Sequence, residues 1–129
     1  MTEIMKRSHA LRDDTTTHYN CAQAVFIPFA EKKGISAAQA TAITANFGSG
    51  MRAGLTCGAI TGGLYGAGDA EASAEFMRRM KDLHGGLSNC RDLLREEVHS
   101  PAEKKPHCDG MVYEAVEIVE EMLMARGLL

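Results

Sequence analysis

Residues 107–126 read HCDGMVYEAVEIVEEMLMAR, and this stretch carries the clearest helical pattern in the chain. Its apolar side chains recur every three or four residues, at Met111, Val112, Ala115, Val116, Val119, Met122 and Leu123. That spacing forms one wide stripe on an α-helix, and Gly127 follows it as a stop signal. The stretch therefore predicts a long amphipathic helix from about His107 to Arg126, with its glutamates on the solvated face.

The rest of the chain continues the helical pattern and contains no convincing strand. Further helices are expected over residues 2–14, 17–33, 36–47, about 56–68 and 70–84, with a short one starting near 89. Thr15–Thr17, Ser36 with Gln39, Asp69 and Asn89 supply capping signals. We therefore predict one all-α domain over residues 1–129, a compact bundle of six or seven helices.

Proline and glycine predict where these helices are interrupted. Pro28 lies inside the second helix and predicts a kink or an early end. The stretches GSGMRAGL (residues 48–55) and SPAEKKP (residues 100–106) predict loops. Glycines recur in the helix that follows Cys57, and each weakens a helix by roughly 1 kcal/mol relative to alanine. Close approach to a neighbouring helix would explain them.

Composition excludes several classes of function. The 129 residues are 45% apolar and 24% charged, as in a soluble globular domain. The net charge is −3 and no basic stripe is present, which argues against nucleic-acid binding. The longest apolar run, Ala24–Ala30, is far shorter than the roughly 20 residues of a membrane span. The first residues show no apolar secretory segment, so we expect a cytoplasmic protein.

Four cysteines, Cys21, Cys57, Cys90 and Cys108, are the most informative residues. None forms a C-x-x-C pair, so zinc-ribbon and thioredoxin-type spacings are absent. In a cytosolic chain, such cysteines indicate redox chemistry or a metal site more often than structural disulfides. Cys57 lies at a predicted helix start, where unpaired amides would lower its thiol pKa from about 8.5 and make it the attacking thiol. Alternatively, it is a small buried residue at a tight helix crossing.

The segments around these cysteines carry a family resemblance. They read YNCAQAV (19–25), TCGAITG (56–62), CRDL (90–93) and HC (107–108). Over roughly residues 17–112 the chain resembles the C_GCAxxG_C_C family of small redox-active proteins, although here Cys57 precedes Gly58 where the family label writes glycine first. The resemblance implies that all four cysteines are functional, in redox chemistry or a metal site. It also implies a partner in an oxidoreductase or transporter system, and no particular reaction.

Three functions remain open at this point. In the first, the chain is a thiol–disulfide oxidoreductase or electron carrier, with Cys57 and Cys21 as the preferred pair and Cys90 and Cys108 as the second. In the second, the four cysteines bind zinc or an iron–sulfur cluster. His18, one turn before Cys21, and His107 are then further candidate ligands.

In the third, the protein is a non-catalytic helical module that forms a homodimer through its last helix. Both redox chemistry and metal binding require that the four thiols converge. We expect them to do so near helix N-termini.

Overall fold

The computed structural model describes all residues from 1 to 129 and contains eight helices and no strand. They are α1 (Glu3–Asp13), α2 (Cys21–Lys32), α3 (Ala37–Ile43), the π-helical turn η1 (Gly50–Gly54), α4 (Gly58–Ala67), α5 (Ala70–Leu83), α6 (Cys90–Glu97) and α7 (Pro101–Ala125). The all-α class is confirmed, whereas the expected count of six or seven helices is too low. The extra element is η1, which lies where a glycine-rich loop was expected.

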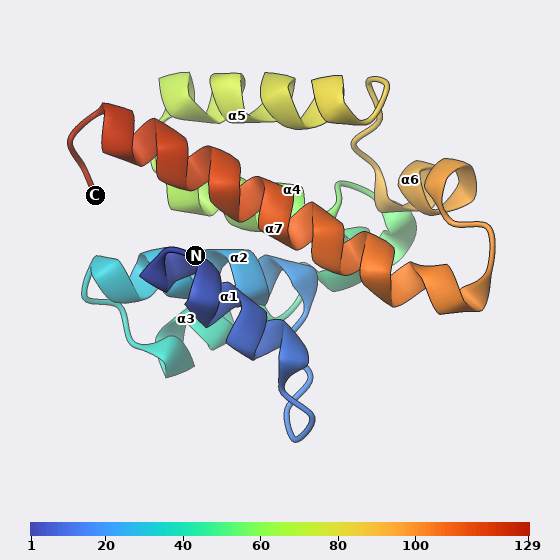
Figure 1. Cartoon of the computed structure of the whole chain (residues 1–129), viewed down its shortest axis with the longest axis horizontal. Coiled ribbons are helices and arrows are strands. Elements are labelled where there is room, and N and C mark those ends of the chain that lie inside the picture. Colours follow the sequence, from blue (N-terminus) through green and yellow to red (C-terminus); the bar gives the residue numbers. More distant parts are fainter.

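The long helix α7 crosses the whole molecule and organises the other elements (Figure 1). Helix α5 lies along one side of it and α1, α2 and α3 along the other, while α4 lies behind it and α6 at one end. Helix α7 begins at Pro101, six residues before the predicted start at His107. The SPAEKKP stretch is therefore helical and not a loop. Proline fits the first turn of a helix, where its missing N–H has no partner to lose.

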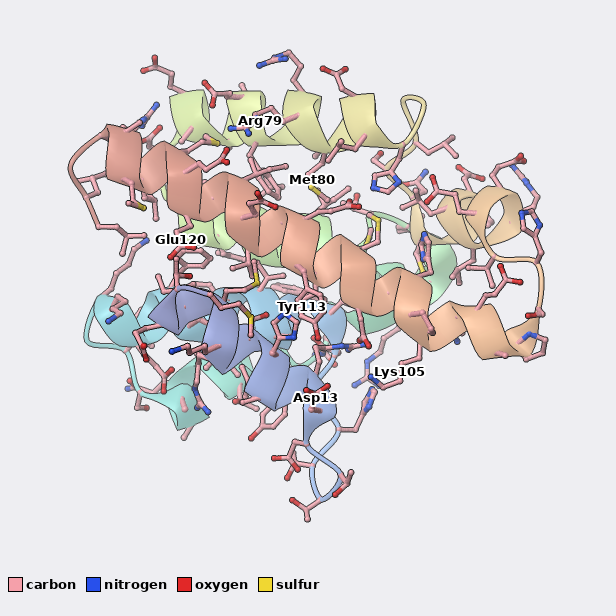
Figure 2. All side chains as sticks on the ribbon, viewed as in Figure 1. Asp13, Arg79, Met80, Lys105, Tyr113 and Glu120 are labelled. Atoms are coloured by element: carbon pink, nitrogen blue, oxygen red, sulfur yellow. The ribbon has the colours of Figure 1, made fainter.

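The hydrophobic core lies between α2, α4 and α7. Every residue of α2 from Ala22 to Ala30 is buried, and the apolar stripe of α7 is buried within the same chain. Met80 of α5 completes the core on the opposite side, between α5 and α7 (Figure 2). A homodimer through α7 stays a prediction. No helix combines the length and apolar character that a membrane crossing requires.

The glycines of α4 allow it to pack closely against its neighbours, as predicted. A Cβ atom on Gly62 would lie 2.6 Å from the carbonyl oxygen of Ala22 in α2. A Cβ on Gly63 would lie 2.1 Å from the ring of Phe76 in α5. Both distances are shorter than non-bonded contact, so no other residue fits at these positions without moving a helix.

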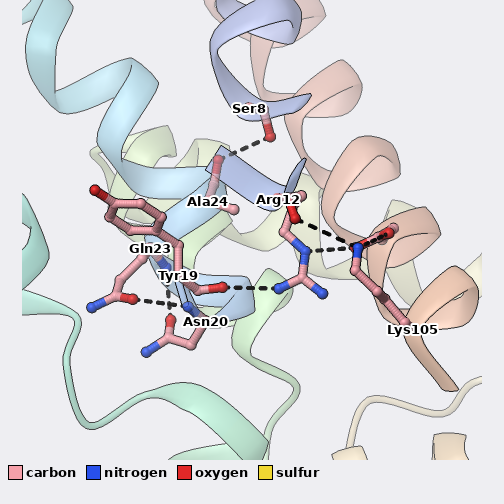
Figure 3. Close-up of polar contacts among 8 residues, drawn as sticks. Ser8, Arg12, Tyr19, Asn20, Gln23, Ala24 and Lys105 are labelled. Atoms are coloured by element: carbon pink, nitrogen blue, oxygen red, sulfur yellow. Dashed lines mark hydrogen bonds and ion pairs between the residues drawn. The ribbon is translucent and has the colours of Figure 1, made fainter. Parts of the chain in front are cut away.

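Pro28 does not end α2, which continues to Lys32. Proline lacks the N–H that would bond to the carbonyl of Ala24 one turn earlier. That carbonyl instead accepts a hydrogen bond of 2.9 Å from the hydroxyl of Ser8 in α1 (Figure 3). Ser8 is fully buried. The neighbouring helix thus supplies the donor that the proline removes, and the expected early end does not occur.

Candidate functional site

The first cysteine, Cys21, is the first residue of α2. Asn20 caps this helix, since its side chain accepts from the amide of Gln23 and the Gln23 side chain accepts from the amide of Asn20 (Figure 3). The side-chain Nδ2 of Asn20 also donates to the backbone carbonyl of Thr44 at the end of α3. The helix therefore begins four residues after the predicted Thr15–Thr17 cap, with Cys21 in its first turn.

Two loop segments hold Cys57 and Cys90 beside each other. Thr56 and Asn89 form an isolated antiparallel β-bridge. The Cys57 amide donates to the carbonyl of Ser88 at 2.8 Å, and the Cys90 amide donates to the carbonyl of Leu55 at 2.6 Å. Cys57 then caps α4 and Cys90 begins α6. This bridge places two cysteines that are 33 residues apart in the sequence at neighbouring helix starts.

Cys108 completes the group from within α7. Its thiol interacts with the Cys21 thiol, and its charge also raises the pKa of Cys90 and of Cys57. The four cysteines therefore belong to one region of the fold, in which Cys108 influences the other three. Three of them lie at helix N-termini, and Cys108 does not, because α7 starts seven residues before it.

The Cys21–Cys108 contact sets the protonation of both thiols. The hydrogen bond from Cys21 lowers the pKa of Cys108 to about 5, and the nearby His107 and Arg12 act in the same direction against burial. The same hydrogen bond, together with burial, raises the pKa of Cys21 well above its usual range. The pair therefore titrates as a unit that shares a proton between its two sulfurs, and these effects favour the thiolate at Cys108.

The other two cysteines remain neutral thiols at pH 7. Burial raises the pKa of Cys57 to about 11, although the amides of Ala59 and Ile60 at the start of α4 lower it. Burial also raises the pKa of Cys90, with a further contribution from Cys108. The prediction that its helix start lowers the pKa of Cys57 is wrong, because its side chain is buried and the cost of desolvating a thiolate outweighs the helix amides.

A cluster of histidines and glutamates adjoins Cys108. The carboxylate of Glu97, the last residue of α6, is hydrogen-bonded to His107 Nε2 at 2.8 Å and to His84 Nδ1 at 2.9 Å. The Nε2 atom of His84 lies 2.6 Å from a carboxylate oxygen of Glu114. Although burial opposes it, Glu114 and Glu97 raise the pKa of His84. The other ring nitrogen of His107, Nδ1, is buried and has no hydrogen-bond partner.

Arg12 is a site residue that sequence reasoning missed. Its side chain is only 7% exposed, and its Nε atom is 2.6 Å from Asp109 Oδ1. Its Nη1 atom donates to the carbonyl of Tyr19 at 3.0 Å (Figure 3). Its positive charge lowers the pKa of both Cys21 and Cys108. On a charged amphipathic helix an arginine reads as a solvated residue, and no local signal marks this one as buried.

The structure also bears on the candidate metal ligands. His18 is exposed and precedes α2, so the helical spacing assumed between it and Cys21 does not exist. No three side chains among histidine, cysteine, aspartate and glutamate are arranged to hold a metal ion together. The four cysteines, His18 and His107 thus do not form a ready ligand set for zinc or an iron–sulfur cluster.

Comparison with known proteins gives one match. Residues 19–122, more than half of the chain, match the family described as "Putative redox-active protein (C_GCAxxG_C_C)". The matched range includes all four cysteines and most of the core helices. No curated protein and no solved structure matches the chain.

Proposed function

We propose that Cys21 and Cys108 cycle between a dithiol and a disulfide, because this chain belongs to the C_GCAxxG_C_C family of redox-active proteins. The observation that carries the proposal is the nearness of the two thiols, because Arg12 bonds both to Asp109, next to Cys108, and to the carbonyl of Tyr19, two residues before Cys21. Each thiol also shifts the pKa of the other, which favours a thiolate at Cys108. A thiolate is the attacking species in thiol–disulfide exchange, and its neighbour must be close enough to resolve the intermediate. This pair replaces the Cys57–Cys21 pair expected from the sequence.

The reaction proceeds in two exchange steps. The Cys108 thiolate attacks one sulfur of a partner disulfide, so that a new S–S bond forms and the partner's own S–S bond breaks. The released partner thiolate takes up a proton. Cys21 then loses its proton and attacks Cys108, which releases the second partner thiol. The protein is oxidised by two electrons and the partner disulfide is reduced to two thiols.

Arg12 and Glu97 support this chemistry from outside the thiol pair. Arg12 places a buried positive charge beside both sulfurs, which stabilises the Cys108 thiolate. Glu97 holds the His107 ring through Nε2, so the unpartnered Nδ1 atom remains in the buried region beside the Cys108 position. Cys57 and Cys90 stay protonated next to the pair, as a second source of thiols.

The proposal is tested by oxidising the reduced protein mildly and mapping its disulfides by peptide mass spectrometry. We expect a Cys21–Cys108 disulfide that forms first and disappears on reduction. Cys108→Ser and Cys21→Ser should each abolish it, whereas the control Cys57→Ser should keep it. Circular dichroism of each variant establishes that the fold is retained.

Three results would overturn the proposal. The first is a first-formed disulfide between any other pair of cysteines in the folded protein. The second is near-stoichiometric zinc or iron after anaerobic purification, with thiols that reagents cannot reach, which would favour a metal site. The third is four thiols that stay inert to mild oxidants, which would favour a purely structural helical module.

A further inference from the structure

We propose that a cationic pocket beside the Cys21–Cys108 pair binds the partner as a small anionic disulfide. The pocket has a volume of about 250 Å³ and is lined by Arg12, Asp14, His18, Tyr19, Lys104 and Lys105. These residues come from the end of α1, the segment before α2 and the first turns of α7. The inference rests on the proposed function, to which it adds the chemical class of the substrate.

The pocket adjoins the thiols through both of the elements that carry them. Tyr19 lies two residues before Cys21, and its carbonyl accepts from Arg12. Lys104 lies one helical turn before Cys108 on α7, and residues four apart share a helix face. The charge of Lys104 also acts on Cys90. The pocket therefore lies against the two segments that carry the thiols, although neither cysteine lines it.

The charge of the pocket is positive. Three permanent cations line it, against one carboxylate, Asp14. The nearby Asp109 lies between Arg12 and Lys105, at 2.6 Å and 2.7 Å, and offsets one of these two charges. Lys105 reaches from α7 toward the end of α1, where Asp13 lies (Figure 2), and donates to the carbonyl of Arg12. The excess cation is Lys104, which forms no ion pair and is exposed.

Free donors in the pocket match what an anion requires. The Nη2 atom of Arg12 makes no hydrogen bond within the protein, whereas Nε and Nη1 are both occupied. The guanidinium is fixed in place by these two bonds, so an incoming carboxylate meets a donor that is already oriented. Lys104 supplies a second, mobile donor. The net charge of the whole chain is −3, so this positive pocket is a local exception that would select anionic substrates.

The experiment compares two disulfides that differ in charge. Oxidised glutathione carries carboxylates and a net negative charge, and 2-hydroxyethyl disulfide is uncharged. The reduced full-length protein is mixed with each one at low salt, and the second-order rate constant for loss of its thiols is measured. The variants are Lys104→Glu and, as a matched control, Lys81→Glu. Lys81 is an exposed lysine of α5 that also forms no ion pair, and α5 lies on the opposite side of α7 from α1 (Figure 1).

We expect Lys104→Glu to slow the reaction with oxidised glutathione by about fivefold or more, since it reverses a charge close to the substrate. The rate with 2-hydroxyethyl disulfide should change less than about twofold, and added salt should reduce the difference. Lys81→Glu makes the same change in net charge and should leave both rates unaltered. The uncharged disulfide also reports any change in the intrinsic reactivity of the thiols.

Two results would overturn the inference, and they differ from failure of the proposed function. Equal slowing of both disulfides by Lys104→Glu would mean that the lysine acts on the thiols and not on the substrate. An unchanged rate with oxidised glutathione would mean that the pocket does not select charge. If neither disulfide oxidised the wild-type Cys21–Cys108 pair, the proposed function itself would be refuted.

Discussion

Replacing Cys21 with alanine removes the hydrogen bond that contributes most to the low pKa of Cys108. In the wild-type protein that pKa is about 5, against an ordinary value of 9.0 for a cysteine thiol. Arg12 and His107 remain in the variant and retain part of the effect. We therefore expect the pKa of Cys108 to rise to about 7 or higher in Cys21→Ala, a change of about 3 kcal/mol in the cost of ionising the thiol.

The assay is the pH dependence of Cys108 alkylation by iodoacetamide, followed on the Cys108 peptide by mass spectrometry. At about pH 6 most of Cys108 is thiolate if its pKa is about 5, and roughly one tenth if its pKa is about 7. The rate at a single pH understates this change, because a thiolate with a higher pKa is intrinsically more nucleophilic. The midpoint of the pH profile is therefore the quantity to compare.

Cys21→Ser is the matched control for this experiment. A serine hydroxyl can donate a hydrogen bond to Cys108 but cannot form a disulfide. The midpoint should accordingly stay closer to that of the wild type in Cys21→Ser than in Cys21→Ala. If Cys21→Ala leaves the midpoint within about half a pH unit of the wild type, the Cys21 thiol does not stabilise the Cys108 thiolate, and the reasoning fails.

Three further predictions concern stability and are checked by denaturant unfolding. Ser8→Ala should lower the free energy of unfolding by about 1–3 kcal/mol, because it leaves the buried carbonyl of Ala24 unpaired. The loss should be clearly smaller in a Pro28→Ala background, where the restored N–H replaces the hydroxyl as donor. Equal losses in both backgrounds would contradict this reasoning. Gly62→Ala should cost about 2 kcal/mol or more by pushing α4 away from α2. At Gly110 an added Cβ meets nothing within 4 Å, so Gly110→Ala should instead stabilise the protein by about 0.5–1 kcal/mol. A comparable loss of stability in Gly62→Ala and Gly110→Ala would refute the packing argument. His84→Gln should destabilise the protein more at about pH 5.5 than at about pH 8.5. A histidine with a raised pKa stabilises the fold at low pH and loses that contribution as pH rises through the raised pKa. A loss of stability that does not depend on pH would show that the charge of His84 is irrelevant.

The helices were predictable because their signals are local. Apolar spacing located every α-helix, and the Ser36–Gln39 capping box and the Asp69 cap are both present in the structure. The start of α7 was missed because Pro101 and Pro106 read as loop residues. Pro101 suits the first turn of a helix, whereas Pro106 lies inside α7 without ending it. The η1 turn was missed since it contains consecutive positive-φ residues, among them Met51 and Arg52, which no periodic pattern marks.

The candidate site was predictable only in part, since its geometry depends on contacts between distant segments. The four cysteines stand out by their residue type and by the family resemblance. Which of them touch depends on the bridge between Thr56 and Asn89 and on the early start of α7. The burial that raises the pKa of Cys57 and encloses Arg12 arises from tertiary packing, and neither effect has a local sequence signal.

The contact between Cys21 and Cys108 has a consequence for how the protein is made. One thiol lies at the start of α2 and the other in α7, which is synthesised later. While α2 is already synthesised and α7 is not, the pair does not exist, and Cys21 lacks the neighbour that makes it part of a reactive dithiol. A nascent or truncated chain therefore carries unpaired thiols of ordinary reactivity. The reactive dithiol arises only when α7 docks against α2, so its appearance reports that these two helices have come together.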